Sequence, residues 1–302
     1  MNFSRVLLTM TMSGYCTLSA ILSKISKKIS IANYSISEKF IIFADMNDEL
    51  AHSDLRDLLL SEAQRINNQA FIAADPVQFP RRFTSLPDIE IAALLASTIS
   101  WGNRKAILKD CERLLGLMDG SPHAWCMDRA YEALDDDMNL HRTFFARNLK
   151  HYMRALRGIY TRYPSLDAYA AANRVGQVEA PSYRLAELLG REIARANDGV
   201  LDTRCLPQNL RTTPLKRLNM AMRWLVRTDG IVDLGVWQSV KPRSLYIPLD
   251  VHSADTARKL GLIRRRSNDR MALLQLMQAV RPMRPEDPAF FDFALFGIGM
   301  GL

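Results

Sequence analysis

The chain has 302 residues, of which 48% are hydrophobic and 24% are charged. These values exclude a disordered or fibrous protein and suit a globular chain of one or two closely joined domains. A formal charge of +8 at pH 7 permits a polyanionic partner such as nucleic acid, although surface charge says nothing about the fold. The 4 cysteines are scattered, without the paired spacing of a zinc site or a disulfide framework, so we expect a reducing, cytoplasmic setting.

Residues 1–45 differ from the rest of the chain. They are rich in serine and carry 5 basic residues against 2 acids, without clear periodicity. The apolar stretch at 6–22 is too short and too rich in Ser and Thr for a membrane span, and it makes a poor secretory signal. We therefore predict a flexible or non-native extension over 1–45, a folded domain over 46–302, and no membrane partner.

From residue 46 onward, apolar residues recur mainly at helical spacing. The segment 89–99 is apolar nearly all round, which predicts a central buried helix. Strand-like alternation is scarce, and 230–249 is expected to be a loop or a short extended piece. One-sided apolar stripes, each typical of a helix with one buried face, occur at 53–70, 107–118, 149–160, 185–193, 215–225 and 273–280. The sequence predicts an all-α fold, a compact multi-helix globule.

Familiar catalytic motifs are missing from the sequence. It contains no G-x-x-x-x-G-K-[ST], H-E-x-x-H or G-x-S-x-G, and no G-x-G-x-x-G opening a helix. The sequence therefore lacks the usual motifs for nucleotide hydrolysis, zinc proteolysis, serine esterase chemistry and Rossmann-type cofactor binding. The 5 histidines do not cluster in the sequence, so we expect no bound metal.

The segment 245–262 places an acid, Asp250, between an apolar run and a short helical pattern. One interpretation is a helix cap, whose side-chain oxygens accept hydrogen bonds from backbone N–H groups of the first turn. The other is a catalytic carboxylate held by the same helix end. His252 follows two residues later and is either a further site residue or a polar side chain bonded locally.

A second candidate is Lys216, at the start of the 215–225 stripe. On a helix it shares an edge with Asn219 and Arg223, beside the buried face. Desolvation and neighbouring positive charge both disfavour an ammonium ion, and a neutral amine is a nucleophile. The alternative is a surface lysine whose alkyl chain covers the apolar edge.

Motifs along 46–302 closely resemble a bacterial family of proteins with no assigned function. They are DPVQFPRRF (75–83), DIEIAALLASTISWGNRKAI (88–107), HRTFF (141–145), KRLNMAMRWLVR (216–227), PLDVHSADTARKLGL (248–262) and DFALFGIGM (292–300).

The same motifs, in the same chain order, distantly resemble the helix-hairpin-helix DNA glycosylases. Residues 93–98 resemble the L-L-S-x-Q/T segment of that superfamily, and 249–252 resemble its V-D-T-H, whose acid is catalytic. Lys216 falls where bifunctional members carry the Schiff-base lysine. The resemblance implies two helical lobes within 46–302, with a cleft between them, and a DNA repair-type glycosylase with abasic-site lyase activity.

The resemblance also implies roles for particular residues. Lys216 would be the nucleophile and Asp250 the acid/base and electrostatic stabiliser, with no cofactor. The expected partner is nucleic acid, with double-stranded DNA first. The residues expected to line the pocket for the flipped nucleotide are Trp101, Asn103, Asn219, Arg223, Trp224 and His252, with Trp101 and Trp224 alternatively being plain core residues. The residues expected to bind the nucleic-acid backbone are Arg147, Lys150, Arg154 and Arg217.

Two features depart from the superfamily pattern. Its hairpin has glycines just before the lysine, because backbone N–H groups must approach a phosphate closely there. This chain has Thr212-Thr213-Pro214-Leu215 instead, and its spacing from Lys216 to Asp250 is longer, which indicates an insertion around 230–244. The alternative hypothesis is therefore a non-catalytic, all-α nucleic-acid-binding or scaffold protein that keeps the glycosylase-like fold.

Overall fold

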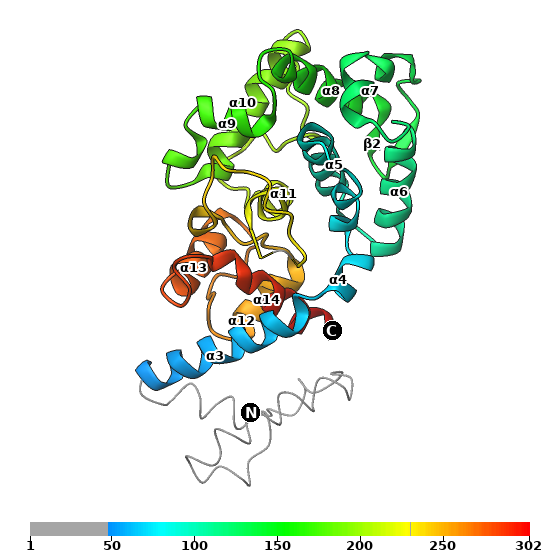
Figure 1. Ribbon diagram of the computed structural model, residues 1–302. Helices are drawn as coiled ribbons and strands as arrows, with labels where there is room; N and C mark the ends of the chain where they lie inside the picture. The colour runs from blue at the N-terminus through cyan, green and yellow to red at the C-terminus, as the bar shows by residue number, and fades with distance from the viewer. Residues whose placement is uncertain (1–47, 230) are drawn as a thin grey trace.

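The computed structural model describes residues 48–229 and 231–302 (Figure 1), and the predicted extension over 1–45 lies outside them. Apart from the antiparallel pair β1 (Asn139–His141) and β2 (Phe144–Phe145), the regular structure described is helical. None of the described helices is both long and apolar enough to cross a membrane. The all-α prediction is confirmed.

The helices follow one another with short connections over most of the chain. The α-helices are α3 (Asp48–Ile66), α4 (Gln69–Ala73), α5 (Leu86–Thr98), α6 (Arg104–Gly116), α7 (Pro122–Met127), α8 (Ala146–Tyr160), α9 (Leu166–Ala172), α10 (Pro181–Ala196), α11 (Lys216–Val226), α12 (Val251–Lys259), α13 (Arg270–Val280) and α14 (Phe291–Met300). Short 3-10 turns are η1 (Pro76–Gln78), η2 (Pro80–Arg82), η3 (Ala130–Ala133), η4 (Val175–Gln177), η5 (Pro242–Ser244) and η6 (Pro288–Phe290). The stripe predicted over 53–70 is interrupted after Ile66, because Asn68 caps α4.

The first and last described helices lie side by side. Helix α14 packs against both α3 and α12, and Figure 1 shows the blue α3 beside the red α14. Two glycines allow this close approach: a Cβ on Gly297 would lie 2.6 Å from Ile66 Cγ1, and one on Gly299 would lie 2.8 Å from the carbonyl oxygen of His252. The glycines of the 292–300 motif therefore serve helix packing.

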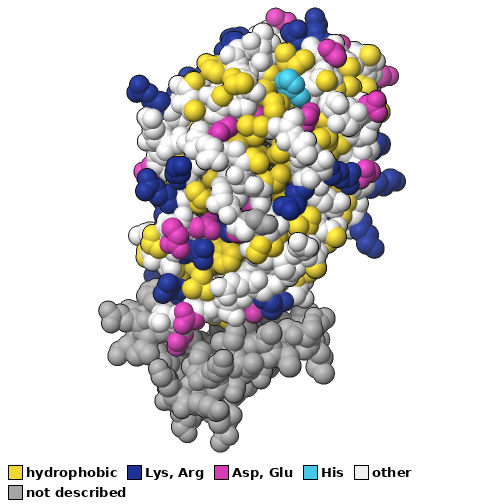
Figure 2. Space-filling model, viewed as in Figure 1, with side chains coloured by type: hydrophobic (Ala, Val, Ile, Leu, Met, Phe, Trp, Pro, Cys, Tyr) yellow, Lys and Arg dark blue, Asp and Glu magenta, His cyan; other side chains and the backbone are white. Residues whose placement is uncertain are grey.

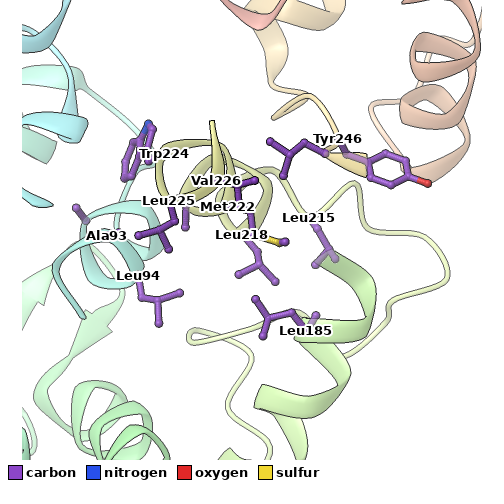
Figure 3. Close-up of a cluster of buried hydrophobic side chains, with 14 of the residues drawn as sticks. Ala93, Leu94, Leu185, Leu215, Leu218, Met222, Trp224, Leu225, Val226 and Tyr246 are labelled. Carbon is purple, nitrogen blue, oxygen red and sulfur yellow. The ribbon is translucent and has the colours of Figure 1, made fainter. Parts of the chain in front are cut away.

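Helices α5 and α11 form the centre of the molecule. Helix α5 is buried from Ile89 to Thr98, as its all-round apolar sequence predicts. Figure 3 shows Ala93 and Leu94 of α5 beside the apolar side chains of α11. Leu218, Met222 and Leu225 are each at most 4% exposed, so the predicted stripe is the buried face of α11.

The loop after α11 packs back onto that helix. The backbone N–H groups of Leu234 and Trp237 donate to the carbonyl oxygens of Trp224 and Leu225, both at 2.8 Å. Trp237 is 2% exposed. The loop between α11 and α12 therefore covers the C-terminal half of α11, without forming a strand in the part of it that the structure describes.

A buried glutamate joins α5 to α9. Glu90 is fully buried, and its carboxylate accepts hydrogen bonds from the backbone N–H groups of Leu166 and Asp167 at 2.7 and 2.8 Å. The hydroxyl of Tyr160 donates a third at 3.1 Å. Burial raises the pKa of Glu90 to about 7, although these hydrogen bonds favour the charged form.

The raised pKa of Glu90 predicts a pH-dependent stability. A carboxyl whose pKa is higher in the folded chain keeps its proton there while the unfolded chain loses it, so the free energy of unfolding falls as pH rises from about 4.5 to about 7. In urea unfolding, Glu90→Gln should remove up to about 3 kcal/mol of the decrease between pH 5 and pH 8. The control variant Glu187→Gln, at an exposed position, should show the same decrease in the free energy of unfolding as wild type. An equal dependence on pH in wild type and Glu90→Gln would show that Glu90 does not cause the decrease.

Candidate active site

A pocket of about 440 Å³ lies between the two central helices and the start of α12. Its walls come from the end of α5, the connection between α10 and α11, the first turn of α11, and residues 249–252. Of the residues predicted as site residues, Lys216, Asp250, Trp101, His252 and Arg217 line it.

The amine of Lys216 lies at the pocket wall and is directed towards Asp250. Lys216 is the first residue of α11, and its Nζ atom is 3.7 Å from Asp250 Oδ2 and 3.4 Å from the carbonyl oxygen of Ser100. Its side chain is 30% exposed. The amine is therefore held by two acceptors while remaining accessible from the pocket.

Asp250 caps a helix and also faces the amine of Lys216. It is the N-cap of α12, and its Oδ1 atom accepts from the backbone N–H of Ser253 at 2.8 Å. The other oxygen, Oδ2, faces Lys216. Because the cap fixes the carboxylate by one oxygen, the second oxygen is held facing the amine.

Trp101 is fixed by a histidine that the sequence did not single out. His141 is fully buried, with Nδ1 at 2.7 Å from Asp110 Oδ2 and Nε2 at 2.9 Å from the carbonyl oxygen of Trp101. Its ring also meets the Trp101 ring edge to face, with centroids 4.6 Å apart. His141, the first residue of the HRTFF motif, therefore holds Trp101, in the connection between α5 and α6, against the pocket.

Two other reactive groups in the pocket wall stay protonated. Burial raises the pKa of the Cys205 thiol and of the Tyr152 hydroxyl well above their usual values. Cys205 Sγ lies 3.1 Å from the carbonyl oxygen of Asn148, to which it donates. A thiol that keeps its proton is a poor nucleophile, so Lys216 is the better candidate in this pocket.

Four residues predicted to line the pocket lie elsewhere. Asn103 is exposed and caps α6 through the backbone N–H of Ala106 at 3.3 Å. Asn219 is 1% exposed and donates to the carbonyl oxygen of Pro214 at 2.9 Å, so it braces the loop before Lys216. Trp224 is fully buried in the core. Arg223 is 4% exposed and bound by carboxylates.

Arg223 in α11 and Arg227 directly after this helix belong to a network of buried ion pairs. Arg223 pairs with Asp292 and with Asp233. Arg227 pairs with Asp233 at 2.5 Å and with Asp287 at 3.0 Å. Burial raises the pKa of Asp292 to about 7, while the charge of Arg223 opposes this rise. Turning either arginine towards a substrate would leave buried carboxylates unpaired, which is strongly destabilising.

The basic face predicted for α8 is neutralised by acids from the preceding segment. Arg147 pairs with Asp137, Lys150 with Asp136 at 2.6 Å, and Arg154 with Glu132 at 2.6 Å. On the face seen in Figure 2, basic and acidic side chains are interspersed without a continuous basic field. These three α8 residues are therefore already paired, whereas Arg217, predicted to bind the backbone too, lines the pocket.

The segment before α11 does not form a tight helical hairpin. Residues 197–215 join α10 to α11 as an irregular connection. Leu215, just before Lys216, has φ +50°, a left-handed conformation that costs a non-glycine residue of the order of 1–2 kcal/mol. Leu215 is only 2% exposed, so burial of its side chain offsets that cost.

No group of metal-binding side chains occurs in the part of the chain that the structure describes. The polar groups in the pocket include an amine, a guanidinium, a carboxylate, hydroxyls, a thiol, a carboxamide and an imidazole. This set of groups suits proton transfer, nucleophilic attack by an amine and hydrogen bonding.

The double role of Asp250 predicts that capping and charge can be separated. Asp250→Asn keeps an oxygen for the Ser253 N–H, so its free energy of unfolding should stay within about 0.5 kcal/mol of wild type. Asp250→Ala should lose about 1 kcal/mol in urea unfolding. Asp269, the N-cap of α13, gives the matched Asn and Ala controls. An equal loss in Asp250→Asn and Asp250→Ala would show that charge, not capping, stabilises this helix start.

Comparison with known proteins identifies the family of the chain. Searches of curated proteins and of solved structures found no match. A family model described as "Protein of unknown function (DUF2400)" matches residues 75–301, which include every residue that lines the pocket. The chain therefore belongs to this DUF2400 family of proteins of unknown function.

Proposed function

We propose that the chain is a DNA repair-type glycosylase with abasic-site lyase activity, in which Lys216 attacks a nucleotide flipped into the pocket. The observation that carries the proposal is the distance of 3.7 Å between Lys216 Nζ and Asp250 Oδ2 at the wall of one pocket. The two residues are far apart in sequence, and each comes from the start of a different helix. A nucleophile beside a base is the arrangement expected for covalent catalysis.

The proposed chemistry needs only these two side chains and water. Asp250 takes a proton from the Lys216 ammonium, and the neutral amine bonds to C1′ while the N-glycosidic bond breaks. The base leaves with the bonding electron pair and takes the proton that Asp250 received from Lys216. The restored Asp250 carboxylate then stabilises the positive charge that develops on the sugar.

The same adduct leads to strand cleavage. Asp250 takes a second proton from Nζ and passes it to O4′ as the C1′–O4′ bond opens, which gives a protonated Schiff base in equilibrium with its neutral form. Removal of a C2′ proton then expels the 3′ phosphate by β-elimination, and water hydrolyses the Schiff base to restore the lysine. The target nucleotide must leave the base stack first, and Trp101 and His252 offer rings at the pocket for the flipped base.

Borohydride trapping tests the proposal directly. Wild type should form a covalent adduct with a duplex containing an abasic site, because borohydride reduces the Schiff base to a stable amine. Lys216→Ala should form none. Asp250→Asn should slow trapping by about 10²- to 10⁴-fold, the usual contribution of a positioned acid or base.

Lys259→Ala is the matched control, since Lys259 is an exposed lysine of α12 outside the pocket. It should trap like wild type. Absence of an adduct across abasic and damaged duplexes, or equal trapping by Lys216→Ala, would remove the Schiff-base mechanism. Retained binding without any adduct would favour the alternative, a non-catalytic nucleic-acid-binding protein.

For the phosphate backbone, we propose the loop between α12 and α13 in place of α8. Arg264 and Arg266 are exposed, and neither pairs with a carboxylate among residues 48–229 and 231–302. Their loop continues to Asn268, which lines the pocket. Unpaired guanidinium groups on a loop that reaches the pocket at Asn268 are suited to binding phosphates and releasing counterions.

Salt dependence distinguishes this loop from α8. In fluorescence anisotropy with a labelled duplex, replacing Arg264 and Arg266 by Ala should reduce the slope of log affinity against log salt by up to about 2. The matched double variant Arg147→Ala and Lys150→Ala removes residues that are already paired, so it should leave the slope nearly unchanged. If the α8 variant reduced the slope and the loop variant did not, the phosphate contacts would lie on α8 instead.

A further inference from the structure

Arg217 is a cation in the pocket wall, next to the lysine. It is the second residue of α11, and its Nη1 atom donates to the carbonyl oxygen of Thr98 at 2.8 Å. Its guanidinium carbon lies 5.2 Å from the centroid of the Trp101 ring. The guanidinium is therefore held between the end of α5 and an aromatic ring, facing the pocket.

The charge of Arg217 has no carboxylate partner within the described residues. Asp250 is the one acid among the residues that line the pocket, and its oxygens are directed to Lys216 and to the N–H of Ser253. Burial lowers the pKa of Arg217 from its usual value, but an arginine keeps its charge in proteins. Arg223 and Arg227 on the same helix show the usual arrangement, in which a buried guanidinium binds carboxylates.

We propose that Arg217 selects the substrate base: the pocket accepts neutral or anionic bases with carbonyl oxygens and disfavours positively charged, N-alkylated bases. The inference rests on the proposed function and names the class of base for that site. The remaining guanidinium N–H groups, for which no acceptor is found in the described chain, donate to carbonyl or ring-nitrogen acceptors at the edge of the base. Arginine is suited to this because its donors lie in one plane and can bind two acceptors at once.

The dimensions and charge of the pocket agree with this assignment. A volume of about 440 Å³ lies within the range of about 300–1,000 Å³ typical of small-ligand pockets. Lys216 and Arg217 are adjacent cations, and Asp250 is already engaged. A base that carries its own positive charge therefore meets repulsion, whereas a carbonyl oxygen meets a donor that needs an acceptor.

Binding can be measured without catalysis in the Lys216→Ala background. The probes are duplexes that contain 8-oxoguanine or uracil, which are neutral bases with carbonyl groups, and a duplex that contains 3-methyladenine, which is a cation without one. Adding Arg217→Gln, which keeps a donor for Thr98 but removes the charge, should weaken binding of the preferred carbonyl-base duplex by about 10- to 100-fold. Binding of the 3-methyladenine duplex should not weaken. Arg217→Ala should give the same pattern, and Arg243→Ala, an exposed arginine outside the pocket, should leave both affinities unchanged.

The outcomes separate the two proposals. Equal affinity for a carbonyl-base duplex with and without Arg217→Gln, or preference of the Lys216→Ala chain for 3-methyladenine, overturns the role of Arg217. The lyase function is tested separately by borohydride trapping at an abasic site, which has no base for Arg217 to contact. Arg243→Ala, at an exposed position outside the pocket, should trap the abasic duplex like wild type, and thermal unfolding followed by circular dichroism should show that the Arg217→Gln chain is folded.

Discussion

The position of α11 depends on the ion network buried beneath it. Two guanidinium groups removed from water need partners, and Arg223 and Arg227 find them in Asp233, Asp287 and Asp292. These carboxylates come from the loop after α11, the turn before α14, and α14 itself. The network therefore fixes the rotation of α11 about its axis. Any other rotation would leave buried charges unpaired and would turn the first residue of α11 away from the pocket.

The network also has an electrostatic link to the pocket. Arg223 lies about two turns after Lys216 on one helix, and the two residues face Asp292 and Asp250 respectively. Ser253 joins the two acids, because its N–H donates to Asp250 and its hydroxyl to Asp292 at 3.5 Å. The charge of Asp250 contributes to the raised pKa of Asp292, after burial. The charge of Asp250 thus acts through space on Asp292, which links the pocket to the ionic core.

The sequence predicts the helices well because burial imposes periodicity, and it predicts side-chain partners poorly. The all-round apolar α5 and the stripe of α11 could be recognised from their spacing. The roles of Arg217 and Arg223 could not be told apart from the sequence, because both lie on α11. Only the fold shows that Arg223 pairs with Asp292, 69 residues further along the chain, whereas Arg217 does not. The pairing of α8 with earlier acids was hidden for the same reason. Lys216 and Asp250 were identified through resemblance to a family, and periodicity alone left both open.

The loop before Lys216 explains how this site differs from one built on a glycine hairpin. Glycines let backbone N–H groups approach a phosphate, but they contribute nothing to a core. Here Leu215 adopts the left-handed conformation and is buried, while Asn219 holds the carbonyl oxygen of Pro214 at 2.9 Å. The loop is thus fixed from the inside of the protein and needs no bound phosphate to order it. In the proposed mechanism, Lys216 is therefore in place before nucleic acid binds, and phosphate binding and positioning of the nucleophile are tasks of separate loops.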